Sequence, residues 1–88
     1  ELGDDYSIVE VNLPPKYDGK TIKEIGVREN YGLLVLTTIS NREEKSLIGK
    51  SRNINKVEGV ASPNNVLNKN DILVVYGSND DIKRFLKG

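Results

Sequence analysis

The sequence predicts a single α+β domain with the element order β-α-β-β-β-α, in which two helices pack on a mostly antiparallel sheet. Three observations support this fold class. The chain has 88 residues, 36% of them apolar, which is enough for one core over residues 1–88. Residues 33–40 and 71–77 are continuous apolar runs typical of buried strands. Segments with helix start and stop signals stand after the first strand and after the last one.

The first strand is expected over residues 6–13, where alternation places Val9, Val11 and Leu13 on one face. Pro14 follows, and it ends the strand because proline has no amide to donate to a sheet.

The first helix is expected over residues 20–25. Thr21 is a candidate N-cap, and Ile22 and Ile25 fall on the same helical face. Gly26 ends this helix, because glycine readily adopts the left-handed conformation that follows a helix. Residues 27–32 are interpreted as a second turn region.

The middle of the chain combines the most apolar run with a long polar segment. Residues 33–40 predict a strand that is buried on both faces at its start. Residues 41–55 are polar and charged apart from Leu47 and Ile48, which predicts either a mobile hairpin or a functional loop.

Residues 45–56, which overlap this segment, contain the only basic run of the chain. It lacks interleaved aromatic residues, so we interpret it as a solvent-exposed loop rather than a patch that follows phosphates. Its members are Lys45, Lys50, Arg52 and Lys56.

The C-terminal third is expected to add a brief strand over residues 57–61 and a strong strand over 71–77. Ser78 or Asn79 then caps a final helix, with acidic residues in its first turn and basic residues near its end. The inward stripe of this helix is expected to be Ile82, Phe85 and Leu86.

Composition excludes several kinds of chemistry. Lys plus Arg and Asp plus Glu each number 13, and there is no Cys and no His. Disulfides, thiolate nucleophiles, the usual zinc sites and histidine bases are therefore absent. We expect no catalytic residue, no metal ligand, no cofactor and no direct nucleic-acid binding. Without a signal peptide or a long apolar run, the chain is expected to be a cytoplasmic domain excised from a longer protein.

One local motif invites a nucleotide-binding interpretation. Gly19, Lys20 and Thr21 match the end of a P-loop, whose backbone amides curl around phosphates. That motif requires a glycine five residues before the Gly-Lys pair, and Pro14 stands there instead. A turn followed by a helix start is the better interpretation.

Arg28 and Tyr31 are the residues singled out by their local setting. Arg28 follows Gly26 and stands before an aromatic residue, so its planar fork could meet a phosphate or carboxylate. A salt bridge, or a cap on the last carbonyls of the helix, is an equally favoured role. Tyr31 could stack on a ligand base, or it could lie at the edge of the core with its hydroxyl in water.

Taken together, these patterns resemble the RCK_C or TrkA-C domain, the C-terminal regulatory domain of potassium channels, potassium transporters and cation/proton antiporters. The resemblance extends over residues 6–86. The matching positions are 19–25, Val27, Arg28, Gly32, 33–36, Pro63, 67–77 and the helix from Asn79.

The resemblance implies a homodimer at the inner face of the membrane, attached to a cation transporter or channel. It also implies a regulatory ligand, cyclic di-AMP, at the dimer interface, with Arg28 at the phosphates and Ile22 and neighbouring aliphatic residues at the bases. The expected ligand-binding residues are Ile22, Lys23, Ile25, Arg28, Tyr31, Leu34 and Pro63.

Two of these positions depart from the pattern of known cyclic di-AMP binders in the family. Lys23 stands where some of them have an apolar residue, and Leu34 stands where some have an asparagine that bonds the ligand. Two other functions remain open from the sequence: a dimerisation or docking module without a ligand, and the effector domain of a DNA-binding regulator.

Overall fold

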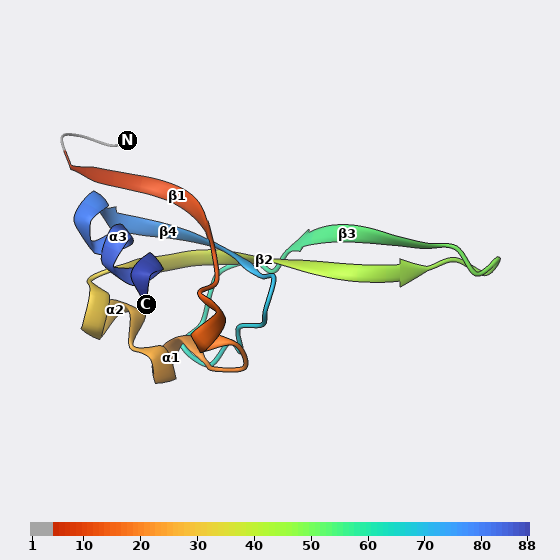
Figure 1. Cartoon of the computed structure of the whole chain (residues 1–88), viewed down its shortest axis with the longest axis horizontal. Coiled ribbons are helices and arrows are strands. Elements are labelled where there is room, and N and C mark those ends of the chain that lie inside the picture. Colours follow the sequence, from red (N-terminus) through yellow and green to blue (C-terminus); the bar gives the residue numbers. More distant parts are fainter. Residues whose placement is uncertain (1–4) are drawn as a thin grey trace.

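The computed structural model describes residues 5–88. The expected order β-α-β-β-β-α is confirmed, with the first helical segment divided into two short helices at Gly26 (Figure 1). The elements are β1 (Tyr6–Asn12), a 3-10 helix (Pro15–Tyr17), α1 (Ile22–Ile25), α2 (Val27–Tyr31), β2 (Leu34–Lys45), β3 (Ser51–Val57), β4 (Ile72–Ser78) and α3 (Asn79–Lys87).

The strands form one sheet in the order β1-β4-β2-β3, and all neighbouring strands are antiparallel. β4 is central to the body of the domain, since it pairs with β1 along its whole length and with the first half of β2. Its alternate residues Leu73 and Val75 are fully buried. The period of two therefore sends one face of β4 into the core and leaves the other face open.

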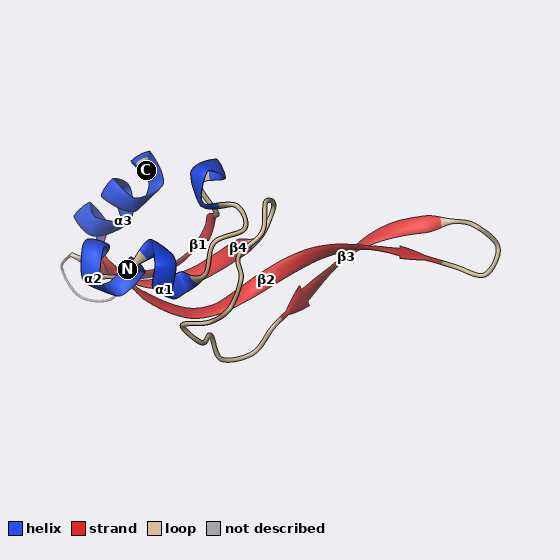
Figure 2. Cartoon of the chain, turned by 90° about the horizontal axis from the view of Figure 1, so that it is seen from below, coloured by secondary structure: helices blue, strands red, loops and turns tan. Residues whose placement is uncertain are grey.

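The helices cover one face of this sheet (Figure 2). Phe85 on α3 is fully buried and lies at the centre of an aromatic cluster. Its ring stacks on Tyr17 at a centroid distance of 5.7 Å and meets Tyr31 edge-on at 5.2 Å. Both arrangements are favoured by the aromatic quadrupole. This cluster joins α3, α2 and the 3-10 helix into one layer.

Helix α3 begins as the sequence predicts. The hydroxyl of Ser78 accepts a hydrogen bond of 3.1 Å from the amide of Asp81. Ile82 and Phe85 are buried, but the prediction that Leu86 also faces inward is wrong, because its side chain is 47% exposed. Leu86 follows Phe85 directly and lies about 100° around the helix from it, which places it at the solvent-facing edge of the apolar stripe.

The interpretation of residues 27–32 as a turn region is also wrong, since α2 occupies Val27–Tyr31. Gly26 and Gly32 both have φ of +68°, and each ends a helix rather than marking an irregular loop. Val27 is 1% exposed and anchors the short helix to the core. A pair of helix-ending glycines is hard to distinguish from turn glycines in a sequence.

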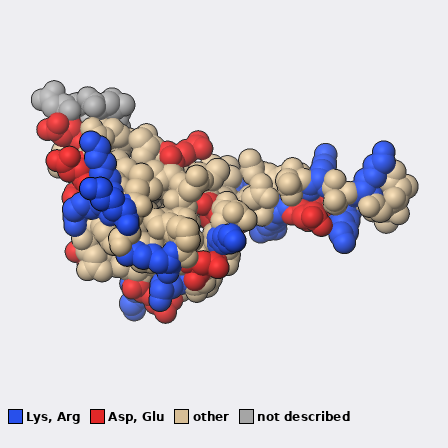
Figure 3. Space-filling view, in the orientation of Figure 1, with Lys and Arg blue, Asp and Glu red and all other residues tan. Residues whose placement is uncertain are grey.

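Residues 40–56 form a two-stranded arm that extends away from the body (Figures 1 and 3). Beyond Ile39, β2 continues without β4 and pairs only with β3. The molecule measures 50 × 27 × 23 Å as a result. Residues 41–55 thus adopt a hairpin conformation, and whether the segment is mobile or functional stays a prediction. The brief strand expected at 57–61 is wrong, because β3 covers Ser51–Val57, where partners from β2 are available.

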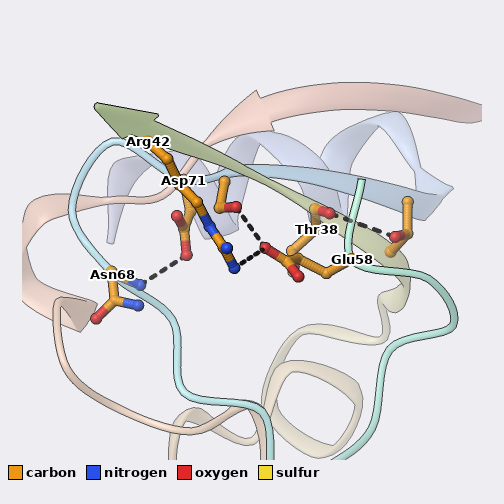
Figure 4. Close-up of polar contacts among 7 residues, drawn as sticks. Thr38, Arg42, Glu58, Asn68 and Asp71 are labelled. Atoms are coloured by element: carbon orange, nitrogen blue, oxygen red, sulfur yellow. Dashed lines mark hydrogen bonds and ion pairs between the residues drawn. The ribbon is translucent and has the colours of Figure 1, made fainter. Parts of the chain in front are cut away.

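The root of the arm is held by Glu58 (Figure 4). Its carboxylate accepts hydrogen bonds from the hydroxyl of Ser40 and from Nη2 of Arg42, the latter at 3.2 Å. These contacts, with the Ser40 bond as the largest cause, lower the pKa of Glu58. Its amide donates to the carbonyl of Thr38 at 2.9 Å. The direction of the arm is therefore fixed where it leaves the sheet.

We expect Phe85→Ala to lower the free energy of unfolding by about 3–5 kcal/mol, because it empties the centre of the aromatic cluster. Leu86→Ala on the same helix is the control, with an expected change below about 1 kcal/mol. Urea unfolding followed by circular dichroism measures both. Equal losses for the two variants would contradict the assignment of Phe85 as the centre of the core.

Candidate ligand-binding site

Helix α1 is fixed at its start by a reciprocal pair of hydrogen bonds. The amide of Glu24 donates to the Thr21 hydroxyl at 3.0 Å, and the Thr21 amide donates to Oε1 of Glu24 at 2.8 Å. The bond from the Thr21 amide is the largest cause of the lowered pKa of Glu24. This capping box confirms the predicted role of Thr21 and sets the direction of the helix.

The connection between β3 and β4 passes across the first turn of α1. The amide of Lys23 donates to the Pro63 carbonyl at 2.9 Å, and the amide of Ile22 donates to the Asn65 carbonyl at 3.2 Å. Amides in the first turn of a helix have no partner within the helix. Here the chain itself supplies the acceptors, and Pro63 is thereby held beside Ile22 and Lys23.

The hydrogen bonds of the three residues before α1 are a further argument against a P-loop. The Gly19 amide donates to the Leu67 carbonyl at 2.8 Å, and the Lys20 amide donates to the Tyr17 carbonyl at 3.1 Å. The Thr21 amide is taken by Glu24. No amide from Gly19 to Thr21 is left for a phosphate.

A cavity of about 220 Å³ lies where α1, α2, the start of β2 and the β3–β4 connection meet. Five of the seven sequence-predicted ligand-binding residues line it: Ile22, Lys23, Arg28, Leu34 and Pro63. The remaining lining residues, which the sequence did not single out, are Glu29, Leu33, Val35, Ala61 and Ser62. Glu29 is the only carboxylate among these ten. The sequence offers two hints that these residues line the cavity. Glu29 is next to Arg28, and Ser62 is next to Pro63.

Arg28 is exposed, and it forms no ion pair or hydrogen bond through its guanidinium within the described residues 5–88. Neither alternative role is observed: Arg28 makes no salt bridge within residues 5–88, and other groups bond the last carbonyls of the helices. The Gly26 amide bonds the Ile22 and Lys23 carbonyls of α1 at 3.0 and 3.1 Å. Arg84 instead donates to the last carbonyls of α2, at 3.5 and 3.4 Å. The five donors of the Arg28 guanidinium therefore remain available at the cavity.

A second, more open hollow of about 420 Å³ adjoins the first and shares Arg28, Leu33 and Leu34 with it. Tyr76 of β4 lines this hollow as well. Leu34 and Tyr76 are 48% and 37% exposed, and they lie on the open face of the sheet. The cavity around Arg28 is thus continuous with an apolar sheet surface.

Two predicted ligand-binding residues lie away from the cavity. Ile25 is 5% exposed and belongs to the core. Tyr31 packs on Phe85, and its hydroxyl lies 2.5 Å from that of Tyr17. The structure thus places Tyr31 at the edge of the core, with Arg84 over its ring at 5.6 Å.

A third hollow, of about 410 Å³, lies at the root of the arm and is mainly polar. Its charged groups are largely engaged with one another. Arg42 pairs with Glu58 at 3.2 Å, and Asp71, 6% exposed, accepts from the Asn68 amide at 2.8 Å (Figure 4). This hollow therefore offers fewer free groups to a ligand than the cavity at Arg28.

Within residues 5–88, no helix is both long enough and apolar enough to cross a membrane. No group of three or more potential metal-ligating side chains is found in that part of the chain either.

With this fold and cavity, the chain belongs to the TrkA-C domain family, which it matches over residues 6–87. It is similar to the Ktr system potassium uptake protein A of Bacillus subtilis (strain 168), with 33% identity over 85 residues. That alignment covers 97% of this chain and 32% of the relative, so the chain spans about a third of the relative's length.

A solved structure shows the same fold with a ligand. It is the Regulator of Conductance of K+ (RCK) C domain of the potassium transport protein KtrA, in complex with cyclic diadenosine monophosphate. The two chains superpose with a TM-score of 0.67 at 27% identity, over 98% of this chain and 86% of the other. The resemblance read from the sequence is thereby confirmed.

The contact between Tyr17 and Tyr31 predicts how stability depends on pH. Burial, followed by the hydrogen bond with Tyr31, raises the pKa of Tyr17 from 10.0 to about 12. Above pH 10 the unfolded chain loses the Tyr17 proton, whereas the folded chain keeps it until about pH 12. We therefore expect Tyr17 to contribute a loss of stability of up to about 1.4 kcal/mol per pH unit within this window.

Urea unfolding at several pH values between 10 and 12 measures this slope. It is expected to be shallower in Tyr17→Phe than in the unmodified chain. Tyr6→Phe, at a position 48% exposed, controls for the loss of a phenol. An unchanged slope in Tyr17→Phe would contradict the proposed origin of the pH dependence.

Proposed function

We propose that this chain is a non-catalytic regulatory domain of a potassium-transport protein at the cytoplasmic face of the membrane. It forms a homodimer that binds cyclic di-AMP at the cavity around Arg28. The observation that carries this proposal is the unpaired guanidinium of Arg28, which lines a largely apolar cavity. Membership of the TrkA-C family and the similarity to a domain in complex with cyclic di-AMP support it.

The chemistry of the cavity suits a ligand with anionic phosphates and flat bases. Arg28 and Lys23 are both exposed and provide the cations for a phosphate. Ile22, Leu34 and Pro63 provide apolar surface against which an adenine can pack. An arginine fork suits phosphate oxygens because it can donate two parallel hydrogen bonds.

The size of the cavity favours a site shared by two copies. Its volume of about 220 Å³ is below the roughly 300–1,000 Å³ typical of sites that enclose a small-molecule ligand. Cyclic di-AMP consists of two identical halves around a two-fold axis. Two copies of the chain related by a two-fold axis would each meet one half of the ligand through the same residues.

The open face of the sheet provides a surface for this dimer. Tyr6, Ile8, Leu34 and Tyr76 lie on it and are 37–48% exposed. The rings of Tyr6 and Tyr76 stack at 5.9 Å, which gives a flat apolar surface across β1 and β4. Because Leu34 and Tyr76 also line the hollow beside Arg28, one contact between copies can bury the face and close the ligand site.

The ligand can regulate an attached transporter because it lies across the two-fold axis of the dimer. A ligand that contacts both copies stabilises the relative orientation in which both half-sites meet it. It can bias an attached transporter only by the difference between its affinities for the two orientations. The ligand-dependent step is therefore a change between subunits rather than within one domain.

We expect Arg28→Ala to weaken cyclic di-AMP binding about a hundred-fold, because each copy loses a charge-assisted hydrogen-bond donor at a phosphate. Isothermal titration calorimetry measures the change, and Arg52→Ala, an exposed arginine on the arm, is the control. Unchanged affinity in Arg28→Ala would place the ligand elsewhere. Absence of binding to the unmodified, dimeric chain would favour a dimerisation module without a ligand.

We expect Ile8→Glu to raise the dissociation constant of the dimer about a hundred-fold, because it buries an unpaired charge twice in a symmetric interface. Sedimentation equilibrium measures the association. Val60→Glu introduces the same charge at a position that is 94% exposed in the β3–β4 connection, and should leave the dimer intact. Equal behaviour of the two variants would rule out the open sheet face as the interface.

A further inference from the structure

The tip of the arm presents two aliphatic side chains directly to solvent. Leu47 is fully exposed, and Ile48 is 79% exposed. The turn that carries them is closed by a hydrogen bond of 3.0 Å from the Gly49 amide to the Ser46 carbonyl. A second bond, of 2.7 Å from the Ser46 amide to the Lys50 carbonyl, joins the strands behind it. Leu47 and Ile48 therefore occupy the two central positions of an ordered turn.

The turn itself does not require aliphatic residues at these positions. Turns favour Gly, Asn, Asp, Ser and Pro, each for a conformational or hydrogen-bonding reason. Gly49, with φ of +82°, already supplies the one left-handed residue. Both faces of the arm are polar, and its residues other than Ser40 and Ile54 are exposed, so the fold offers no core to the two aliphatic side chains.

The charged side chains at the very end of the arm, Lys45 and Lys50, are both positive, and Glu44 lies beside them. Residues 45–52 contain Lys45, Lys50 and Arg52 and no carboxylate. Arg52 pairs with Glu44 at 3.1 Å, whereas Lys45 and Lys50 form no ion pair within residues 5–88. Figure 3 shows Lys and Arg side chains along the arm and at its far end. The chain as a whole has a net charge of zero, so this is a local concentration of positive charge.

We propose that the arm tip docks onto the surface of an anionic lipid bilayer. Leu47 and Ile48 enter the boundary between head groups and acyl chains, while Lys45 and Lys50 meet the lipid phosphates. Apolar side chains next to basic ones are the combination that binds such an interface. Lysine suits this position because its aliphatic stem can lie in the apolar layer while its ammonium group stays with the phosphates.

The small size of the apolar tip favours a lipid surface over a protein partner. A stable protein interface buries about 800 Å² on each side, and only two apolar residues at the end of the arm are available for it. The flanks of the arm carry Asn41, Asn53 and Asn55 rather than an apolar stripe along either strand. A bilayer needs no extended complementary surface, because a few apolar side chains can insert between its lipids.

Co-sedimentation of the purified chain with lipid vesicles tests this proposal. We expect binding to vesicles of phosphatidylglycerol and phosphatidylcholine, and little binding to phosphatidylcholine alone. Raising the salt to about 1 M, where the Debye length is about 3 Å, should release the bound chain. Binding that ignores lipid charge or salt, or the absence of binding to anionic vesicles, would overturn the proposal.

Substitutions then identify the tip as the site. We expect Leu47→Ser with Ile48→Ser to lower the partition coefficient about ten-fold, and Lys45→Gln with Lys50→Gln to lower it at least as much. Val60→Ser and Lys83→Gln with Lys87→Gln are the matched controls, since they change exposed aliphatic and basic residues away from the arm. Equal loss in a control and in its tip variant would refute the assignment.

This proposal does not depend on the ligand site, and the experiment separates the two. Arg28→Ala should bind vesicles as well as the unmodified chain does, and the tip variants should bind cyclic di-AMP normally. Tip variants that lose both activities would indicate a folding defect, which circular dichroism detects. In that case Lys45→Gln alone, an exposed single change, decides between the two explanations.

Discussion

The hydrogen bonds between the first turn of α1 and the β3–β4 connection are the contacts on which the candidate site depends. The Ile22 and Lys23 amides need acceptors, and the carbonyls of Asn65 and Pro63 supply them. This pairing closes one wall of the cavity and fixes α1 against the sheet. Gly26 then turns the chain so that Arg28, on the next short helix, faces the same space. The candidate site thus depends on hydrogen bonds that satisfy backbone groups.

Much of the fold was predictable because its strong elements carry clear local signals. β4 and the start of β2 are apolar runs that form strands, and Ser78 caps α3 where its sequence indicates. The expectation that β2 is buried on both faces at its start is wrong, because Leu34 faces the open side of the sheet and is 48% exposed. The secondary-structure predictions fail where one sequence pattern is compatible with two conformations. Residues 27–32 contain a single helical turn between two glycines, and residues 51–57 have no apolar alternation to mark a strand. Their conformations depend on partners that lie elsewhere in the chain.

The candidate site was indicated by the resemblance to a family more than by the residues alone, and its role in binding stays a prediction. Arg28 could be singled out by its position after Gly26. The sequence could not show that its guanidinium stays unpaired, because this depends on contacts in space. One of them is that Arg84, from a distant part of the chain, bonds the last carbonyls of α2. Tyr31 illustrates the converse. A sequence pattern could not distinguish a tyrosine that faces a ligand from one that packs on Phe85. Tyr31 and Phe85 are more than 50 residues apart in the sequence, so their contact is not a local one.

β2 has a mechanical consequence that goes beyond its place in the sheet. It is one strand from Leu34 at the cavity to Lys45 beside the arm tip, with a shift in its pairing to β4 between Val35 and Thr37. Its 12 residues extend about 40 Å. Glu58 secures the point where the strand leaves the body. A tilt of the sheet by about 5° around the cavity would therefore displace the far end by about 3.5 Å, given a strand of this length. A small rotation of the domain is therefore converted into a larger displacement of the arm tip.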